Sequence, residues 1–131
     1  MLDDAPLLRR TLSLNAAFSA LCGGGFLLAR EPLAAWLGLS QASVLAGIGA
    51  LLLAFAAHLT WASRRRMPLA EALYFIASDA LWVVGTAVIL VAFPAELSTV
   101  GRAAALAVAA VVGTFAVLQG LGVRQVSSPA A

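Results

Sequence analysis

The sequence predicts an all-α integral membrane protein, a four-helix bundle built from two consecutive helical hairpins. Three observations support this prediction. The 131 residues are 63% hydrophobic and 11% charged, whereas a soluble domain carries about 25% charged residues. Four apolar stretches are each long enough to cross a hydrocarbon core of ~30 Å at ~1.5 Å per helical residue. The arginines lie mainly on one side of these stretches.

Charged residues and prolines mark the ends of the four stretches. We expect one domain over residues 1–131, with helices at approximately 11–29, 43–62, 72–93 and 103–123. The first connection contains Pro32 and the third begins at Pro94, and the residue before a proline disfavours helical backbone. Within the first connection, residues 33–39 with Trp36 predict a turn of helix at the membrane interface. The small and polar residues 125–131 predict a disordered tail.

The first apolar stretch also has the outline of a cleaved signal peptide. Arg9 and Arg10 precede an apolar run, as they would in a secretory signal. A cleavage site before Cys22 would need a small residue where Leu21 stands. We therefore expect this stretch to remain as the first transmembrane helix.

The distribution of arginine predicts the orientation of the bundle. Six arginines flank the side of the N-terminus, namely Arg9, Arg10, Arg64, Arg65, Arg66 and Arg124. Only Arg30 and Arg102 lie on the other side. Because cytoplasmic loops carry the excess of arginine and lysine, we expect both termini in the cytoplasm of a bacterium and the bundle in its inner membrane. The run of residues 64–66 is then a loop anchor on anionic lipid, and we expect no nucleic-acid partner.

The scarcity of cysteine and histidine limits the chemistry of the chain. Cys22 is the single cysteine and His58 the single histidine. An internal disulfide is therefore excluded, and a zinc site of the usual kind lacks ligands. No set of nucleophile and base accompanies the buried acidic residue described below. We expect no catalytic residue, metal or cofactor, although acid–base chemistry by Asp79 and His58 stays open as a minor alternative.

Small residues at a spacing of four predict close packing between helices. Lipid tails are as apolar as leucine, so helices in a membrane associate through close contact and polar groups. The stripes are Thr11, Asn15, Ser19 and Gly23; Ala42, Ala46, Ala50 and Ala54; and Ala105, Ala109 and Gly113. We expect all three stripes to face the interior of the bundle. A leucine at position 50 or 109 is predicted to disrupt the fold.

One polar residue in each helix lies at a similar depth. Counting from the flanking charges places these residues ~7–12 Å along their helices, and they are Asn15, His58, Asp79 and Gln119. An ionised Asp at a helix centre costs roughly 2.5–3.5 kcal/mol, so Asp79 should face inward, within reach of His58 or of Asn15 and Gln119. A pair in which His58 is protonated and Asp79 ionised would satisfy both groups. Tyr74 and Trp82 are close enough in sequence to line the same region.

This polar cluster has two interpretations. It can be structural, because interhelical hydrogen bonds of ~0.6 kcal/mol each determine which helix packs on which. It can also be a pocket for a ligand or a proton that opens toward the cytoplasm. The same two interpretations extend to Tyr74, which is also a candidate for an interfacial anchor.

Three short segments resemble a group of small bacterial four-helix membrane proteins without an assigned activity. These segments are residues 14–19 (LNAAFS), 77–83 (ASDALWV) and 115–119 (FAVLQ). The resemblance implies a four-helix fold and brings no activity with it. The small multidrug transporters are similar in length and helix number, but their hallmark is a glutamate within the first helix. This chain has Asn15 there, which argues against the proton-coupled export of that family.

Two functions compete. The first is an accessory or scaffolding subunit of a membrane complex, with another membrane protein or a second copy as its partner and the lipid bilayer around it. This hypothesis fits a chain without a predicted soluble domain or a catalytic motif. The alternative is a small transporter or ligand-binding protein that uses a polar pocket around Asp79 and His58.

Overall fold

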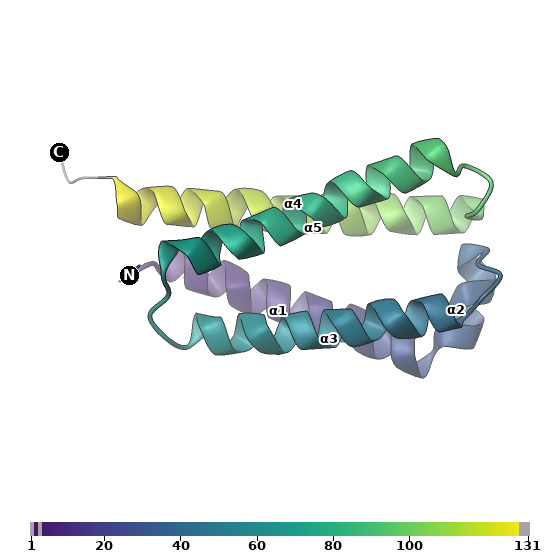
Figure 1. The fold of residues 1–131 in the computed structure, drawn as a ribbon, viewed down its shortest axis with the longest axis horizontal. Coiled ribbons are helices and arrows are strands. Elements are labelled where there is room, and N and C mark those ends of the chain that lie inside the picture. The colour runs from purple at the N-terminus through teal and green to yellow at the C-terminus, as the bar shows by residue number, and fades with distance from the viewer. Residues whose placement is uncertain (1, 3, 129–131) are drawn as a thin grey trace.

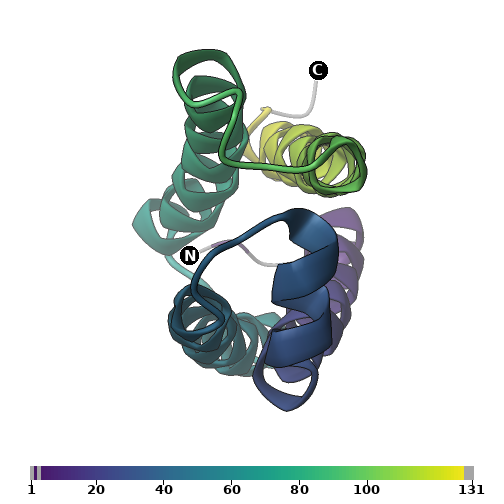
Figure 2. The same cartoon turned by 90° about the vertical axis from the view of Figure 1, so that its right-hand side faces the viewer.

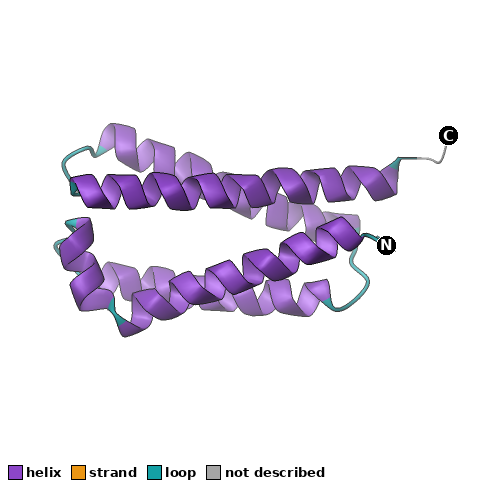
Figure 3. Ribbon diagram, turned by 180° about the vertical axis from the view of Figure 1, so that it is seen from behind, coloured by secondary structure: helices purple, strands orange, loops and turns teal. Residues whose placement is uncertain are grey.

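The computed structural model describes residues 2 and 4–128, and its regular elements are all helices in this part of the chain (Figure 1, Figure 3). The helices are α1 (Pro6–Leu28), α2 (Arg30–Leu37), α3 (Ser43–Ser63), α4 (Leu69–Ala92) and α5 (Thr99–Ser127). The predicted all-α fold is therefore confirmed. Short connections join consecutive helices, as Figure 3 shows.

Four of these helices are long and apolar enough to cross a membrane, namely α1, α3, α4 and α5. The shortest of them, α3, has 21 residues, and at ~1.5 Å per residue it extends about 32 Å, slightly more than a hydrocarbon core. The eight residues of α2 are too few for a span. The four predicted spans correspond to these four helices, as expected of a multi-pass membrane protein.

Local sequence sets the helix ends. Pro6 stands in the first turn of α1, where its missing N–H costs no hydrogen bond. Ser98 caps α5, because its Oγ accepts a hydrogen bond of 2.9 Å from the Gly101 N–H. At the other end, α5 continues to Ser127, so the predicted disordered tail is wrong for positions 125–127. The apolar Val126 packs against the core there, which favours continued helix, and positions 129–131 lie outside the described residues.

The predicted interfacial turn at residues 33–39 is the helix α2. It ends at Gly38, whose φ of 80° is left-handed and suits glycine. Ser98 fastens this end to the start of α5, because its N–H donates to the Leu37 carbonyl at 2.9 Å and its Oγ donates to the Trp36 carbonyl at 2.6 Å. α2 therefore bridges the first hairpin and α5.

The helices form two antiparallel pairs. α1 packs along α3, and α4 packs along α5, which confirms the two consecutive hairpins of the prediction. Contact between α1 and α5 joins the two pairs. Among the described residues α3 and α4 share no extensive contact, and the views along and across the bundle show them diverging (Figure 1, Figure 2).

The apolar core of buried side chains lies at the end of the bundle that holds the N-terminus, the α3–α4 loop and the end of α5, which we call the termini end (Figure 1). The Leu2 N–H donates to the Met67 carbonyl of that loop at 2.8 Å. The fully buried Leu8, Leu12 and Phe75 lie in this apolar core. Toward the other end α4 diverges from α3, while α2 keeps the first hairpin in contact with α5.

Two glycines bring α1 and α3 into backbone contact. A Cβ added at Gly23 would lie 2.8 Å from the Gly49 carbonyl oxygen, and one added at Gly49 would lie 2.8 Å from the Gly23 carbonyl oxygen. The predicted stripe of α1 is confirmed, because Thr11, Asn15, Ser19 and Gly23 are all buried.

The predicted stripe of α3 is wrong at Ala50, which is exposed. Close approach at Gly49 turns that glycine and Ala56 toward α1, and Ala50 is therefore turned away. Ala54 is exposed as well, whereas Ala42 and Ala46 are half-buried. In α5, the half-buried Gly113 faces Val83 of α4, and a Cβ added there would lie 3.6 Å from its side chain.

Candidate functional site

Three polar side chains from three helices meet at Asp79, and we call them the Asp79 cluster. Asn15 of α1 donates from Nδ2 to Asp79 Oδ2 at 2.7 Å, and Gln119 of α5 donates from Nε2 to the same oxygen at 2.8 Å. Ser19 extends the cluster by donating to Asn15 Oδ1 at 3.2 Å. Asn15, Asp79 and Gln119 are almost completely buried. Asp79 therefore faces inward as predicted, and its partners are Asn15 and Gln119.

The helices place this cluster at the joint between the two pairs. Asn15 lies on the buried stripe of α1, and Gln119 lies one turn before Gly122 on the buried face of α5. A Cβ added at Gly122 would lie 2.9 Å from the Leu8 backbone nitrogen, so α5 approaches α1 closely there. Asp79 reaches the same joint from α4. The cluster thus connects α1, α4 and α5 through a single carboxylate oxygen.

Acceptors exceed donors in the Asp79 cluster. Both amide donors bind Oδ2, and Oδ1 of Asp79 has no hydrogen-bond partner among the described residues. Asp79 also lines the pocket described below. Gln119 Oε1 is buried without a partner in the described part of the chain. An unpaired buried acceptor costs about 1–3 kcal/mol, so the cluster is incomplete by itself.

The predicted pair of His58 with Asp79 is wrong. His58 Nε2 instead lies 3.0 Å from Glu71 Oε1, and Arg65 Nη2 donates to both Glu71 oxygens at 2.6 and 2.7 Å. Glu71 lies near the loop, where α4 is still close to α3. Asp79 lies two helical turns further along α4, where the two helices have begun to diverge.

His58, Arg65 and Glu71, which we call the loop cluster, connect α3 to α4 at the termini end. The His58 ring also packs on Phe75, with ring centroids 4.8 Å apart. The Arg65 guanidinium lies 3.7 Å from the centre of the Trp61 ring, within the range of a cation–π contact. The sequence predicts a loop anchor on lipid for Arg65 and indicates no role for Glu71. Their opposite charges across a tight turn were the signal that could have revealed them.

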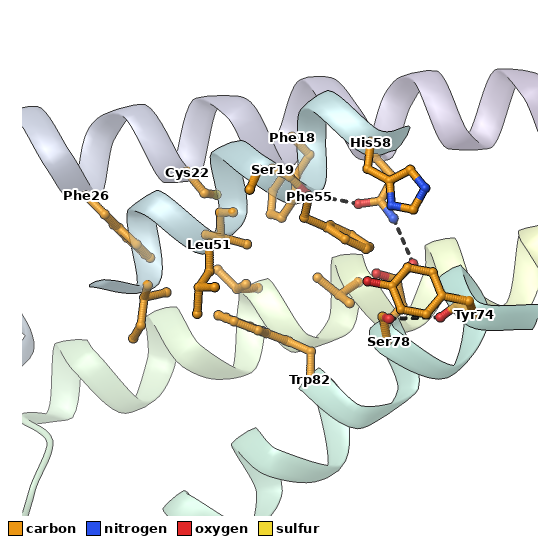
Figure 4. A pocket seen from close by; sticks show the side chains of 17 residues that line it. Phe18, Ser19, Cys22, Phe26, Leu51, Phe55, His58, Tyr74, Ser78 and Trp82 are labelled. Carbon is orange, nitrogen blue, oxygen red and sulfur yellow. Dashed lines mark hydrogen bonds between the residues drawn. The ribbon is translucent and has the colours of Figure 1, made fainter. Parts of the chain in front are cut away.

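A pocket of about 540 Å³ separates the two helix pairs (Figure 4). Small-molecule sites typically enclose ≈ 300–1,000 Å³. Of the predicted site residues, Asn15, His58, Asp79, Tyr74 and Trp82 line the pocket. Gln119 does not line the pocket, but it donates a hydrogen bond to Asp79, which does. The walls come from α1, α3, α4 and α5, and the pocket lies where α3 and α4 diverge.

The pocket has a polar and an apolar part. Around the Asp79 cluster it is lined by Asn15, Ser19, His58 and Ser78. The remaining walls are apolar or aromatic and include Phe26, Ile48, Leu51, Leu52, Val108 and Val112. In the described chain, the ionisable residues that line the pocket are Asp79, His58, Cys22 and Tyr74. The described residues hold no group of three histidine, cysteine or acidic side chains that could bind a metal ion.

Comparison of the chain with protein-family models, with curated proteins and with solved structures gives no match. The resemblance to small bacterial four-helix proteins therefore stays a prediction. What the site can do follows from its own geometry. A buried carboxylate with a free oxygen, beside a largely apolar pocket, can bind a molecule that combines an apolar body with a hydrogen-bond donor.

Proposed function

We propose that this chain is a multi-pass protein of the inner (plasma) membrane, with both termini in the cytoplasm, that binds a small amphiphilic molecule in the pocket between its helix pairs. One observation carries the proposal. The pocket of about 540 Å³ ends at a buried carboxylate whose Oδ1 has no partner in the described chain. A purely structural cluster would be expected to complete its own hydrogen bonds.

The position of the pocket supports access from the bilayer. In a membrane, the opening between α3 and α4 faces the hydrocarbon. Leu51 of α3 and Tyr74 of α4 line the pocket and are also more than a third exposed, so they stand at its rim. A lipid-soluble molecule can pass between these helices without crossing the headgroups. The loop cluster closes the same gap at the termini end.

A binding role fits the residues better than catalysis does. Neither a nucleophile with its base nor a metal set lies among the described residues of the pocket. The accessory-subunit hypothesis stays a prediction, and no feature of the described residues favours it over ligand binding. Transport across the membrane would need a second opening, and the binding proposal does not depend on one.

The experiment uses Trp82 as a reporter inside the pocket. Trp36 and Trp61 do not line the pocket, so changing both to Phe leaves Trp82 as the single tryptophan. This chain is placed in nanodiscs of zwitterionic lipid and titrated with dibromodecylammonium, dibromodecanol and dibromodecanoate, whose bromine quenches tryptophan at short range. A chain that keeps only Trp36 measures the quenching caused by partition into lipid.

We expect at least one of the three probes to quench Trp82 in a saturable manner, beyond the background of the Trp36 chain. A matched pair of variants locates the binding. Ala54 lines the pocket and Ala57 does not, although both are exposed on α3. Ala54→Phe should weaken the saturable quenching, and Ala57→Phe should leave it unchanged. Unsaturable quenching by all three probes, equal to that at Trp36, contradicts the proposal.

A further inference from the structure

We infer that the molecule bound in this pocket is a lipophilic amine, held as an ammonium ion whose N–H groups face Asp79. This inference rests on the proposed function, because it names the chemical class of the molecule that the same pocket takes. Three independent features of the lining lead to it: its charge, its hydrogen-bonding capacity and its aromatic side chains.

The charge of the pocket is the first feature. The described residues give Asp79 no ion-pair partner. Arg65 and His58 are both bound to Glu71, and no arginine lines the pocket. Ionisable residues inside a membrane pair with one another or with the ligand they serve. The missing positive charge can therefore be supplied by the ligand.

Hydrogen bonding distinguishes an amine from other polar groups. Asp79 lines the pocket, and its Oδ1 is an acceptor without a donor in the described chain. An ammonium group carries donors and no acceptor, whereas an alcohol carries both and a carboxylate only acceptors. Ser78 and Ser19 cannot supply the missing donor as they stand, because each donates elsewhere, to the Tyr74 carbonyl and to Asn15.

Aromatic rings surround the rest of the pocket. The lining includes Phe18, Phe26, Phe55, Tyr74 and Trp82, which we call the aromatic wall (Figure 4). Figure 4 shows Trp82 and Phe26 along the apolar part, with Tyr74 beside the polar end. Ring faces attract a cation within ≈ 6 Å of their centroids, and the effect grows when the cation is desolvated. The same rings also pack an apolar chain, so both parts of a lipophilic amine are accommodated.

The test compares the three brominated probes on the Trp82 chain in zwitterionic nanodiscs, with the Trp36 chain correcting for partition. We expect dibromodecylammonium to bind about tenfold or more tightly than dibromodecanol, because only the ammonium adds an ion pair to its hydrogen bond with the Asp79 carboxylate. Dibromodecanoate should not bind saturably. Asp79→Asn should reduce the affinity for the ammonium to that for the alcohol, and circular dichroism shows whether the variant is folded.

Each result is decisive. If the alcohol or the carboxylate binds as tightly as the ammonium, the pocket binds an amphiphile of another class and this inference fails, while the proposed function stands. An unchanged ammonium affinity in Asp79→Asn has the same meaning. If Asp79→Asn does not fold, the preference of the chain with Asp79 intact decides the question by itself. If no probe binds saturably, both the inference and the proposed function fail.

Discussion

A single carboxylate oxygen organises the interior of the bundle at the scale of residues. Asp79 Oδ2 accepts hydrogen bonds from Asn15 and Gln119, which come from two other helices. In lipid such bonds determine which helices associate, because apolar contact alone does not distinguish one helix face from another. The same arrangement leaves Asp79 Oδ1 beside the pocket. One side chain therefore serves both the fold and the proposed binding site.

We expect Asn15→Leu to lower the free energy of unfolding by about 1–3 kcal/mol. The change removes one of the two donors to Asp79 and the acceptor of Ser19. Thermal unfolding in mild detergent, followed by circular dichroism, measures the loss. Ser13→Leu is the control, since Ser13 lies on the exposed side of the same helix. Equal stability of the two variants would show that the cluster contributes nothing to the fold.

Much of the Asp79 cluster could be predicted from the sequence, because the distance to flanking charges determines depth in a helix. Asn15, Asp79 and Gln119 meet as expected. The partner of His58 could not be predicted in this way. The partner of His58 depends on the conformation of the α3–α4 loop and on where α3 and α4 diverge. The depth of a residue along its own helix determines neither of these.

Glycine contacts hold the elements together. Gly23 and Gly49 place α1 and α3 in backbone contact, and Gly122 places α5 against Leu8 of α1. Helices in membranes use such small residues to gain close packing where hydrophobicity offers no advantage. The α1 stripe was predictable because polar residues mark it. The α3 stripe was not predictable, because an alanine-rich helix carries small residues on several faces. The face that contacts α1 contains Gly49, one residue before the predicted Ala50.

We expect Gly23→Ala to destabilise the bundle by about 1–3 kcal/mol, as overpacking typically does. Its Cβ would lie 2.8 Å from the Gly49 carbonyl oxygen, a backbone atom that cannot rotate away. Gly24→Ala is the matched control, because nothing lies within 4 Å of a Cβ added there. Thermal unfolding of both variants under the same conditions checks this difference, and an equal loss in both would refute the contact.

The joint between the helix pairs depends on Gly122 in the same manner. Gly122→Ala should push α5 away from Leu8, where the added Cβ would lie 2.9 Å from a backbone nitrogen. Because Gln119 lies one turn earlier, we expect weaker probe binding at Trp82 as well as lower stability. Gly120→Ala, which meets nothing within 4 Å, should change neither. Unaltered quenching and unfolding in Gly122→Ala would contradict this account of the joint.

At the scale of the whole molecule, hydropathy and length determine the number of spans, whereas the pocket arises from helix angles. The sequence predicts four helices and their pairing, because short connections force neighbours to lie antiparallel. Glycines bring α1 close to α3 and α5 close to α1, whereas the loop cluster joins α3 to α4 only near the loop. Beyond that loop α3 and α4 diverge. These contacts join residues far apart in the sequence, so no local pattern predicts the pocket.

The orientation of the whole molecule can be tested with reporter fusions. Six of eight arginines lie on the side of the termini, so we expect an alkaline phosphatase fused after Ser128 to be inactive in the cytoplasm. The same enzyme fused after Ser40, in the connection between α2 and α3, should be active in the periplasm. The reverse pattern of activities would overturn the assigned orientation and leave the fold unaffected.

The most direct test of the central claim, that this bundle binds a lipophilic amine between its helix pairs, is photo-crosslinking in nanodiscs. A decylammonium carrying a diazirine on its chain is irradiated with the unmodified protein, and mass spectrometry identifies the labelled residues. We expect labelling of pocket residues such as Phe18, Phe55 and Trp82, and its suppression by excess unlabelled decylammonium. Labelling confined to exposed residues such as Leu21 and Val91, without competition, would contradict the account.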